Sequence, residues 1–205
     1  MTVKQESRVT HTMTACVLTG LAVGLAGCSA TGNPKPDITV GYYEVSGRTT
    51  KAIDRQLALH GPYVPGKGRV LAATDISLIP RIVLEEQLGK CSLAQAQFQV
   101  KAKVTLPKWR QRKSARGDIA DTWDNFAAYA AVHELVHIRI AEDHADKLSR
   151  RLNKLPTQAD CKTLGKKIDA VVKAIEAEHG RAQDKFDADE AKRFDRLVAE
   201  ADARS

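Results

Sequence analysis

The chain has 205 residues, of which 43% are hydrophobic, and a formal net charge of +7. This length suits a single domain with a real core. Much of the positive charge lies in one basic run, KWRQRKSAR at 108–116, which we expect to be a solvated loop that could touch acidic lipid or polysaccharide. Nucleic acid is not an expected partner, because residues 1–27 have the features of an export signal.

Residues 1–27 are predicted to be a signal peptide. Lys4 and Arg8 precede an uncharged apolar run at 13–27, which is shorter than the roughly 20 residues that span a bilayer. The run ends in LAGC, which resembles the lipobox cut by the lipoprotein signal peptidase, so we expect a lipid on Cys28. The alternative is an ordinary signal peptide followed by a chance cysteine.

Residues 28–36 are predicted to be a flexible membrane tether, since SATGNPKP contains one glycine and two prolines. Ser29, next to the lipidated cysteine, fits sorting to the outer membrane of a Gram-negative cell better than inner-membrane retention. We therefore expect an exported protein, lipid-anchored to the cell envelope at the outer membrane and facing the periplasm. Residues 37–205 would form one domain.

The first part of this domain is predicted to be mainly β-structure. DITVGYYEV (37–45) is β-branched and aromatic and predicts a strand, and 69–79 predicts another. Between them, 49–61 predicts a helix that a threonine caps and Gly61-Pro62 ends. QFQVKAKVTLP (97–107) alternates apolar and polar residues without a fault, which predicts a half-buried strand.

The second part is predicted to be helical. Apolar residues recur at helical spacing from about 119 to 152, and Pro156 ends the pattern. A second helix should begin near Thr157 and could loosen around His179-Gly180, and from 184 the charged sequence predicts a solvated helix or a frayed tail. The expected fold class is α+β: a small N-terminal sheet with one helix, followed by two long antiparallel helices.

The cysteines predict one disulfide. Cys16 leaves with the signal peptide and Cys28 carries the lipid, which leaves Cys91 and Cys161 in an oxidising compartment. A metal site built on these two cysteines is the weaker alternative, because neither belongs to a CxxC motif.

The longer helix contains the motif that carries the chemistry, an HExxH formed by His133, Glu134 and His137. Residues four apart on a helix face the same way at about 6 Å, so the two imidazoles can bind one Zn²⁺. Glu134 is then placed to act as general base toward a water activated by the metal. The alternative is an ordinary helix with solvated or hydrogen-bonded histidines.

A third protein ligand is expected, and the sequence leaves its identity open. His144 cannot share a metal with His133 on a continuous helix, because their Cα atoms lie about 16 Å apart along the axis. The ligand should come from the following helix, and we favour His179, since Gly180 allows close backbone approach. The other candidates there are Glu176, Glu178 and Asp187. No oxyanion donor stands out among Tyr42, Tyr43, His144 and Arg181.

Together these pieces resemble a bacterial family of predicted secreted zinc-dependent proteases, domain of unknown function 922. The resemblance covers roughly 38–183 and rests on YYEVSGRT, HGP at 60–62, GKC ending at Cys91, TLPKW at 105–109, Trp123 ahead of HExxH, and Cys161. The family also tends to carry HG followed by Gln in a stretch holding YD; HGRAQ (179–183) is similar to the first part and KFD (185–187) to the second. The resemblance implies a cysteine pair, a zinc site and peptidase-like activity, with the third ligand open between His179 and Asp187.

The function that the sequence predicts is that of a lipid-anchored zinc metallopeptidase with a zincin-like domain, acting on peptide or protein substrates. His133 and His137 would bind Zn²⁺, and Glu134 would be the general base. The first alternative is a zinc-binding envelope lipoprotein without turnover. The second is a metal-free envelope interaction module that uses the basic loop.

Overall fold

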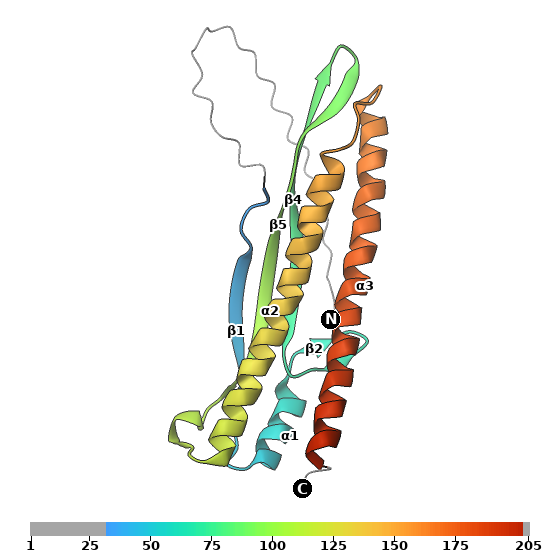
Figure 1. Ribbon diagram of the computed structural model, residues 1–205. Helices are drawn as coiled ribbons and strands as arrows, with labels where there is room; N and C mark the ends of the chain where they lie inside the picture. Colours follow the sequence, from blue (N-terminus) through green and yellow to red (C-terminus); the bar gives the residue numbers. More distant parts are fainter. Residues whose placement is uncertain (1–31, 203–205) are drawn as a thin grey trace.

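The computed structural model describes residues 32–202, which form the predicted α+β arrangement (Figure 1). The predicted signal peptide and Cys28 lie outside the described residues. The main elements are β1 (Asp37–Val45), α1 (Thr50–His60), β4 (Ala73–Gln87), β5 (Lys90–Trp109), α2 (Asp118–Leu152) and α3 (Cys161–Asp202). Three short elements complete the fold: β2 (Tyr63–Val64), β3 (Gly68–Arg69) and a 3₁₀ turn, η1 (Arg112–Ser114).

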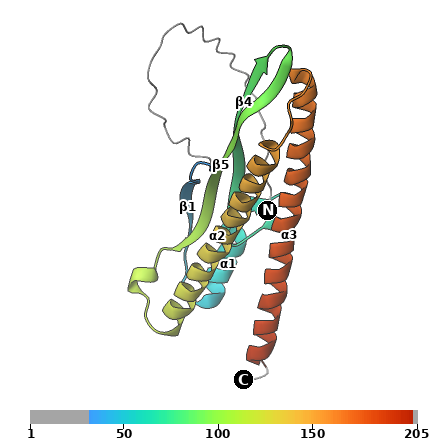
Figure 2. The same cartoon turned by 45° about the horizontal axis from the view of Figure 1, so that its top comes forward.

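The sheet has the strand order β1-β5-β4, with β1 parallel and β4 antiparallel to β5. The predicted alternation in β5 is confirmed, because Phe98, Val100, Ala102 and Val104 are all buried. α2 packs along this face, where its buried residues include Ile138. Figures 1 and 2 show α2 crossing the sheet along β5, with α3 running beside it.

The predicted helices are confirmed with small differences at their ends. α1 is capped by Thr49, whose side chain accepts a hydrogen bond from the backbone N–H of Ala52. α2 has Asp118 in its first turn and Arg151 in its last, which complements the helix dipole. α3 continues through His179-Gly180 without a break, so the expected loosening there does not occur.

The central strands are longer than the sequence predicts. β4 begins at Ala73, because part of the strand predicted at 69–79 belongs to β3 and a turn, and it continues through Pro80 to Gln87. Proline is tolerated because β4 is an edge strand. The turn to β5 has positive φ at Leu88 (51°) and Gly89 (73°), and leucine is not a usual turn residue there, so the sequence gives no hairpin signal.

The predicted disulfide joins Cys91 at the start of β5 to Cys161 at the start of α3. The backbones of Cys91 and Gln158 also exchange two hydrogen bonds, of 2.9 and 2.8 Å. These links hold the start of α3 against the β4–β5 hairpin, beyond the end of α2 (Figure 1). The disulfide therefore fixes how far along α2 each residue of α3 lies.

We expect the Cys91–Cys161 bond to stabilise the fold by about 4 kcal/mol in the chain-entropy model, since it closes a loop with a sequence separation of 70. Thiol labelling of the oxidised protein under denaturing conditions should find neither cysteine reactive. A Cys91→Ser/Cys161→Ser double variant should lose this stability in urea unfolding. Unchanged stability of that variant would contradict the role given to the bond.

Part of the expected tether lies against the domain. The Asn33 side chain accepts hydrogen bonds from Phe98 N (2.8 Å) and Ser149 Oγ (2.7 Å), and donates one to Asp146 (2.9 Å). Gln97 also donates to the backbone oxygen of Gly32. The segment from Gly32 is thus attached to β5 and α2.

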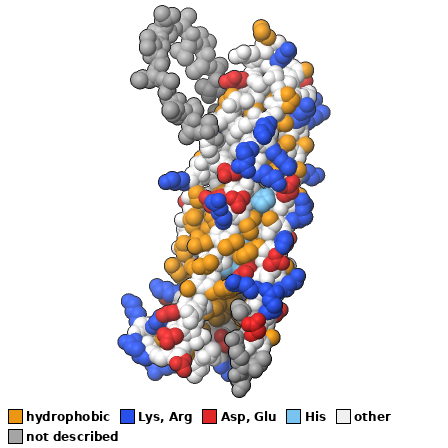
Figure 3. Space-filling view, in the orientation of Figure 1, with side chains coloured by type: hydrophobic (Ala, Val, Ile, Leu, Met, Phe, Trp, Pro, Cys, Tyr) orange, Lys and Arg blue, Asp and Glu red, His pale blue; other side chains and the backbone are white. Residues whose placement is uncertain are grey.

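The surface combines charged helices with an apolar strip. Lys, Arg, Asp and Glu side chains cover the outward side of the helices in Figure 3, and apolar side chains gather beside α2. Ile38 and Val40 of β1 and Leu135 of α2 are exposed although they are apolar. No helix within residues 32–202 is long and apolar enough to cross a membrane.

Candidate metal centre

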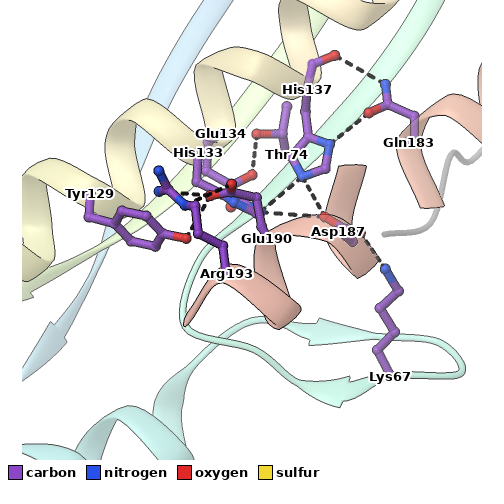
Figure 4. Close-up of polar contacts among 10 residues, drawn as sticks. All are labelled: Lys67, Thr74, Tyr129, His133, Glu134, His137, Gln183, Asp187, Glu190 and Arg193. Atoms are coloured by element: carbon purple, nitrogen blue, oxygen red, sulfur yellow. Dashed lines mark hydrogen bonds and ion pairs between the residues drawn. The ribbon is translucent and has the colours of Figure 1, made fainter. Parts of the chain in front are cut away.

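α2 places both histidines of the HExxH motif on the side that faces α3. His133 and His137 are four residues apart, and their ring centroids lie 4.8 Å apart at 79°. Their Nε2 atoms are 3.1 Å apart and point to the same position (Figure 4). His137 is buried and His133 is half-buried.

α3 brings one carboxylate to these histidines, that of Asp187. Its Oδ1 lies 3.0 Å from Nε2 of His137 and 3.4 Å from Nε2 of His133. Three donors at zinc-ligand distance in tetrahedral geometry would be about 3.3 Å apart, close to the separations observed. His133, His137 and Asp187 can therefore hold a metal ion.

Gln183 fixes the tautomer of His137. The end of the Gln183 amide that faces the backbone oxygen of His137, at 3.0 Å, must be the nitrogen Nε2, because a carbonyl oxygen can only accept a hydrogen bond. Its Oε1 therefore faces Nδ1 of His137 at 2.6 Å, so Nδ1 carries a proton and donates. In the neutral ring this leaves Nε2 with a lone pair toward Asp187, as a metal ligand requires.

His179, the favoured third ligand from sequence, lies outside the group that the structure brings together. It is about two turns from Asp187 along α3, and its Nε2 accepts a hydrogen bond from Gln183 at 2.7 Å. Burial lowers the pKa of His179 to about 4, so its ring is neutral at pH 7. Its neighbour His144 has a ring centroid 5.3 Å away and donates from Nδ1 to Ile140 O.

His133 is oriented by ring packing. The ring of Phe186 lies against it with a centroid distance of 4.8 Å. The ring of Tyr129, one turn earlier in α2, has its centroid 6.2 Å away. Among the described residues, Nδ1 of His133 is a buried atom without a hydrogen-bond partner. Ring packing thus orients His133 without setting its tautomer, whereas the Gln183 amide sets the tautomer of His137.

The electrostatics of the site favour a positive charge between the ligands. A hydrogen bond with Asp187 is the main cause that raises the pKa of His133. Burial alone would raise the pKa of Asp187, but hydrogen bonds from His133 and Lys67 hold it well below its usual range. Asp187 is therefore an anion that can face a cation, as a carboxylate metal ligand must be.

Glu134 lies beside the three candidate metal ligands at the wall of a cavity of about 280 Å³. It is buried, and its Oε2 accepts a hydrogen bond from the Thr74 hydroxyl at 2.6 Å. The cavity lies between α2, the first residues of β4 and the β2–β3 hairpin, and its wall includes Tyr63 and Lys67. The side chains considered as oxyanion donors from sequence, Tyr42, Tyr43, His144 and Arg181, are not among its lining residues in the described chain.

Sequence reasoning gave no role to Thr74, Lys67 and Gln183. Thr74 and Lys67 belong to separate segments, and no local pattern connects either of them to HExxH. The sequence of α3 did contain a pattern that could have identified Gln183 and Asp187. Every fourth residue lies on the same side of a helix, and this spacing joins Ile175, His179, Gln183 and Asp187.

We expect Gln183→Ala to weaken zinc binding by about 10- to 100-fold, because partners that orient ligating histidines contribute about that much. The variant leaves His137 without its acceptor and free to change tautomer. Competition with a chelating dye measures the affinity. Gln158→Ala is the matched control, since Gln158 lies in the connection between α2 and α3 and bonds to Cys91 through its backbone. Equal affinities in the two variants would contradict the role of Gln183.

The chain matches the family described as a bacterial protein of unknown function, DUF922, over residues 40–194. Neither the search of curated proteins nor the search of solved structures finds a match. The matched range contains β4, β5 and most of β1, the three candidate metal ligands, Glu134 and both disulfide cysteines. The chain therefore belongs to the DUF922 family of bacterial proteins.

Proposed function

We propose that this protein is a zinc-dependent metallopeptidase of the HExxH type with a zincin-like arrangement of its site. The observation that supports this best is the meeting of His133, His137 and Asp187 with Glu134 beside one cavity. A zinc ion held there would act as a Lewis acid and lower the pKa of a water molecule. Two histidines and a carboxylate also suit iron, but a glutamate within the HExxH helix is what hydrolysis requires.

Each residue of the site would have a separate role. His133, His137 and Asp187 would hold the metal, with Gln183 keeping His137 in the correct tautomer. Glu134 would accept the proton of the attacking water and pass it to the leaving amine. Thr74 would hold one oxygen of Glu134, which fixes the direction of the carboxylate.

A zinc site that only ties α2 to α3 is the rival, and the position of the ligands on both helices favours it. Structural zinc sites usually have four protein ligands, whereas the described residues supply a group of three. The presence of Glu134 in a cavity wall also favours turnover. Hydrolysis of an unfolded protein substrate that stops on chelation and returns with zinc would support the peptidase; zinc binding without any hydrolysis would support the rival.

We further propose that the protein is lipid-anchored through Cys28, at the outer membrane and facing the periplasm. The support is the LAGC sequence at 25–28 and the apolar run before it. A Cys28→Ser variant should no longer partition into detergent, because it lacks the acceptor for the lipid. Unchanged partitioning would place the anchor elsewhere.

A further inference from the structure

Lys67 reaches the candidate metal centre from the hairpin on the other side of the cavity (Figure 4). It lies in the turn between β2 and β3, flanked by Gly66 and Gly68, whose φ angles of 81° and 79° favour glycine. The base of the hairpin is closed by a hydrogen bond from Val70 N to Pro62 O at 3.0 Å. Lys67 is thus presented by a short, braced turn.

The chain also keeps this hairpin close to α1. A Cβ atom at Gly61 would meet the backbone oxygen of Val70 at 2.2 Å, so only glycine allows the approach. Arg69 adds a hydrogen bond from Nη1 to the oxygen of Gly61 at 2.7 Å. The hairpin that carries Lys67 is therefore held against the end of α1 by close backbone packing.

The two carboxylate oxygens of Asp187 have different partners. Oδ1 faces the Nε2 atoms of His133 and His137, whereas Oδ2 lies 2.5 Å from Nζ of Lys67. An ammonium group donates hydrogen bonds and accepts none. Lys67 therefore occupies Oδ2 and leaves Oδ1 toward the histidines.

The expected contribution of this ion pair to stability is small. The Lys67 and Asp187 side chains are 38% and 23% exposed, and ion pairs in contact with solvent contribute little to folding. Its effect is on geometry, because it determines which oxygen of the carboxylate faces the metal position. Ligating carboxylates commonly depend on such hydrogen-bonded partners.

We propose that Lys67 is a positioning residue that makes Asp187 present a single oxygen to the metal. The proposal rests on the metal centre proposed above. Catalytic zinc sites combine three protein donors with one open position. A carboxylate that could turn both oxygens toward the ion would fill that position, and Lys67 prevents this by holding Oδ2.

The experiment compares three variants of the purified protein. Lys67→Met keeps a long unbranched side chain without the charge, and Lys67→Arg keeps the charge. Lys185→Met is the control, since Lys185 lies two residues from Asp187 but pairs with Asp189 on the exposed side of α3. Each protein is loaded with Co²⁺ for visible absorption spectra, and its zinc affinity is measured by chelator competition.

Lys67→Met should weaken the visible Co²⁺ bands several-fold, the change that follows when a four-coordinate ion gains a fifth ligand. It should also lower zinc affinity by about tenfold. Lys67→Arg and Lys185→Met should resemble the wild type in both measurements. A Lys67→Met protein with wild-type spectrum and affinity would overturn the role of Lys67, whereas a wild type that binds neither ion would overturn the metal centre and the proposal together.

Discussion

Replacing Glu134 with Gln should abolish hydrolysis while leaving the fold and the metal site in place. The amide has the size of the carboxylate and can still bond to Thr74, but it cannot take a proton from water. General acid–base catalysis contributes about 10²- to 10⁴-fold, so the loss in kcat should be at least about 100-fold. Zinc content and thermal stability should remain close to those of the wild type.

The control for this variant is Glu142→Gln, which removes a carboxylate from the same helix. Glu142 forms an ion pair with Arg139 in α2 and lines no part of the cavity in the described chain. Its hydrolysis rate should be unchanged. If Glu134→Gln hydrolyses peptides as fast as Glu142→Gln does, Glu134 is not the general base.

His137→Ala should have a larger effect on metal binding and stability than Glu134→Gln. It removes one of three donors, so zinc affinity should fall by more than about 100-fold, and folding energy supplied by the metal is lost with it. It also leaves Oε1 of the buried Gln183 without its donor, which costs about 1–3 kcal/mol even without zinc. Urea unfolding with and without zinc separates the two contributions.

His144→Ala serves as the reference for His137→Ala, because His144 is a histidine of the same helix outside the metal-binding group. It should keep wild-type zinc affinity. An equal loss of zinc in both variants would mean that the histidines act on the fold and not as ligands.

Periodicity was sufficient to predict most of the fold. The α+β order, β1, α1 and the length of α2 follow from patterns that local physics controls, namely alternation, capping and helical spacing. The β4–β5 hairpin escaped prediction because its turn uses Leu88 at positive φ and its edge strand includes Pro80. In both places tertiary context overrides the local preference.

The third ligand could not be predicted because it depends on the register of two helices. If α3 began level with the end of α2 at Leu152, His179 would lie beside the HExxH histidines. The disulfide at Cys161 instead starts α3 farther out, so a later residue, Asp187, reaches the site. No pattern within either helix encodes this offset, although the spacing of Gln183 and Asp187 on one side of α3 was visible.

The metal content of the purified protein, measured by mass spectrometry after dialysis against trace zinc, tests the central claim most directly. The wild type should hold one zinc per chain and no iron, Asp187→Ala should hold almost none, and His179→Gln should keep one. Zinc retained in Asp187→Ala but lost in His179→Gln would contradict the ligand set, and a wild type without any bound metal would contradict the metal centre itself.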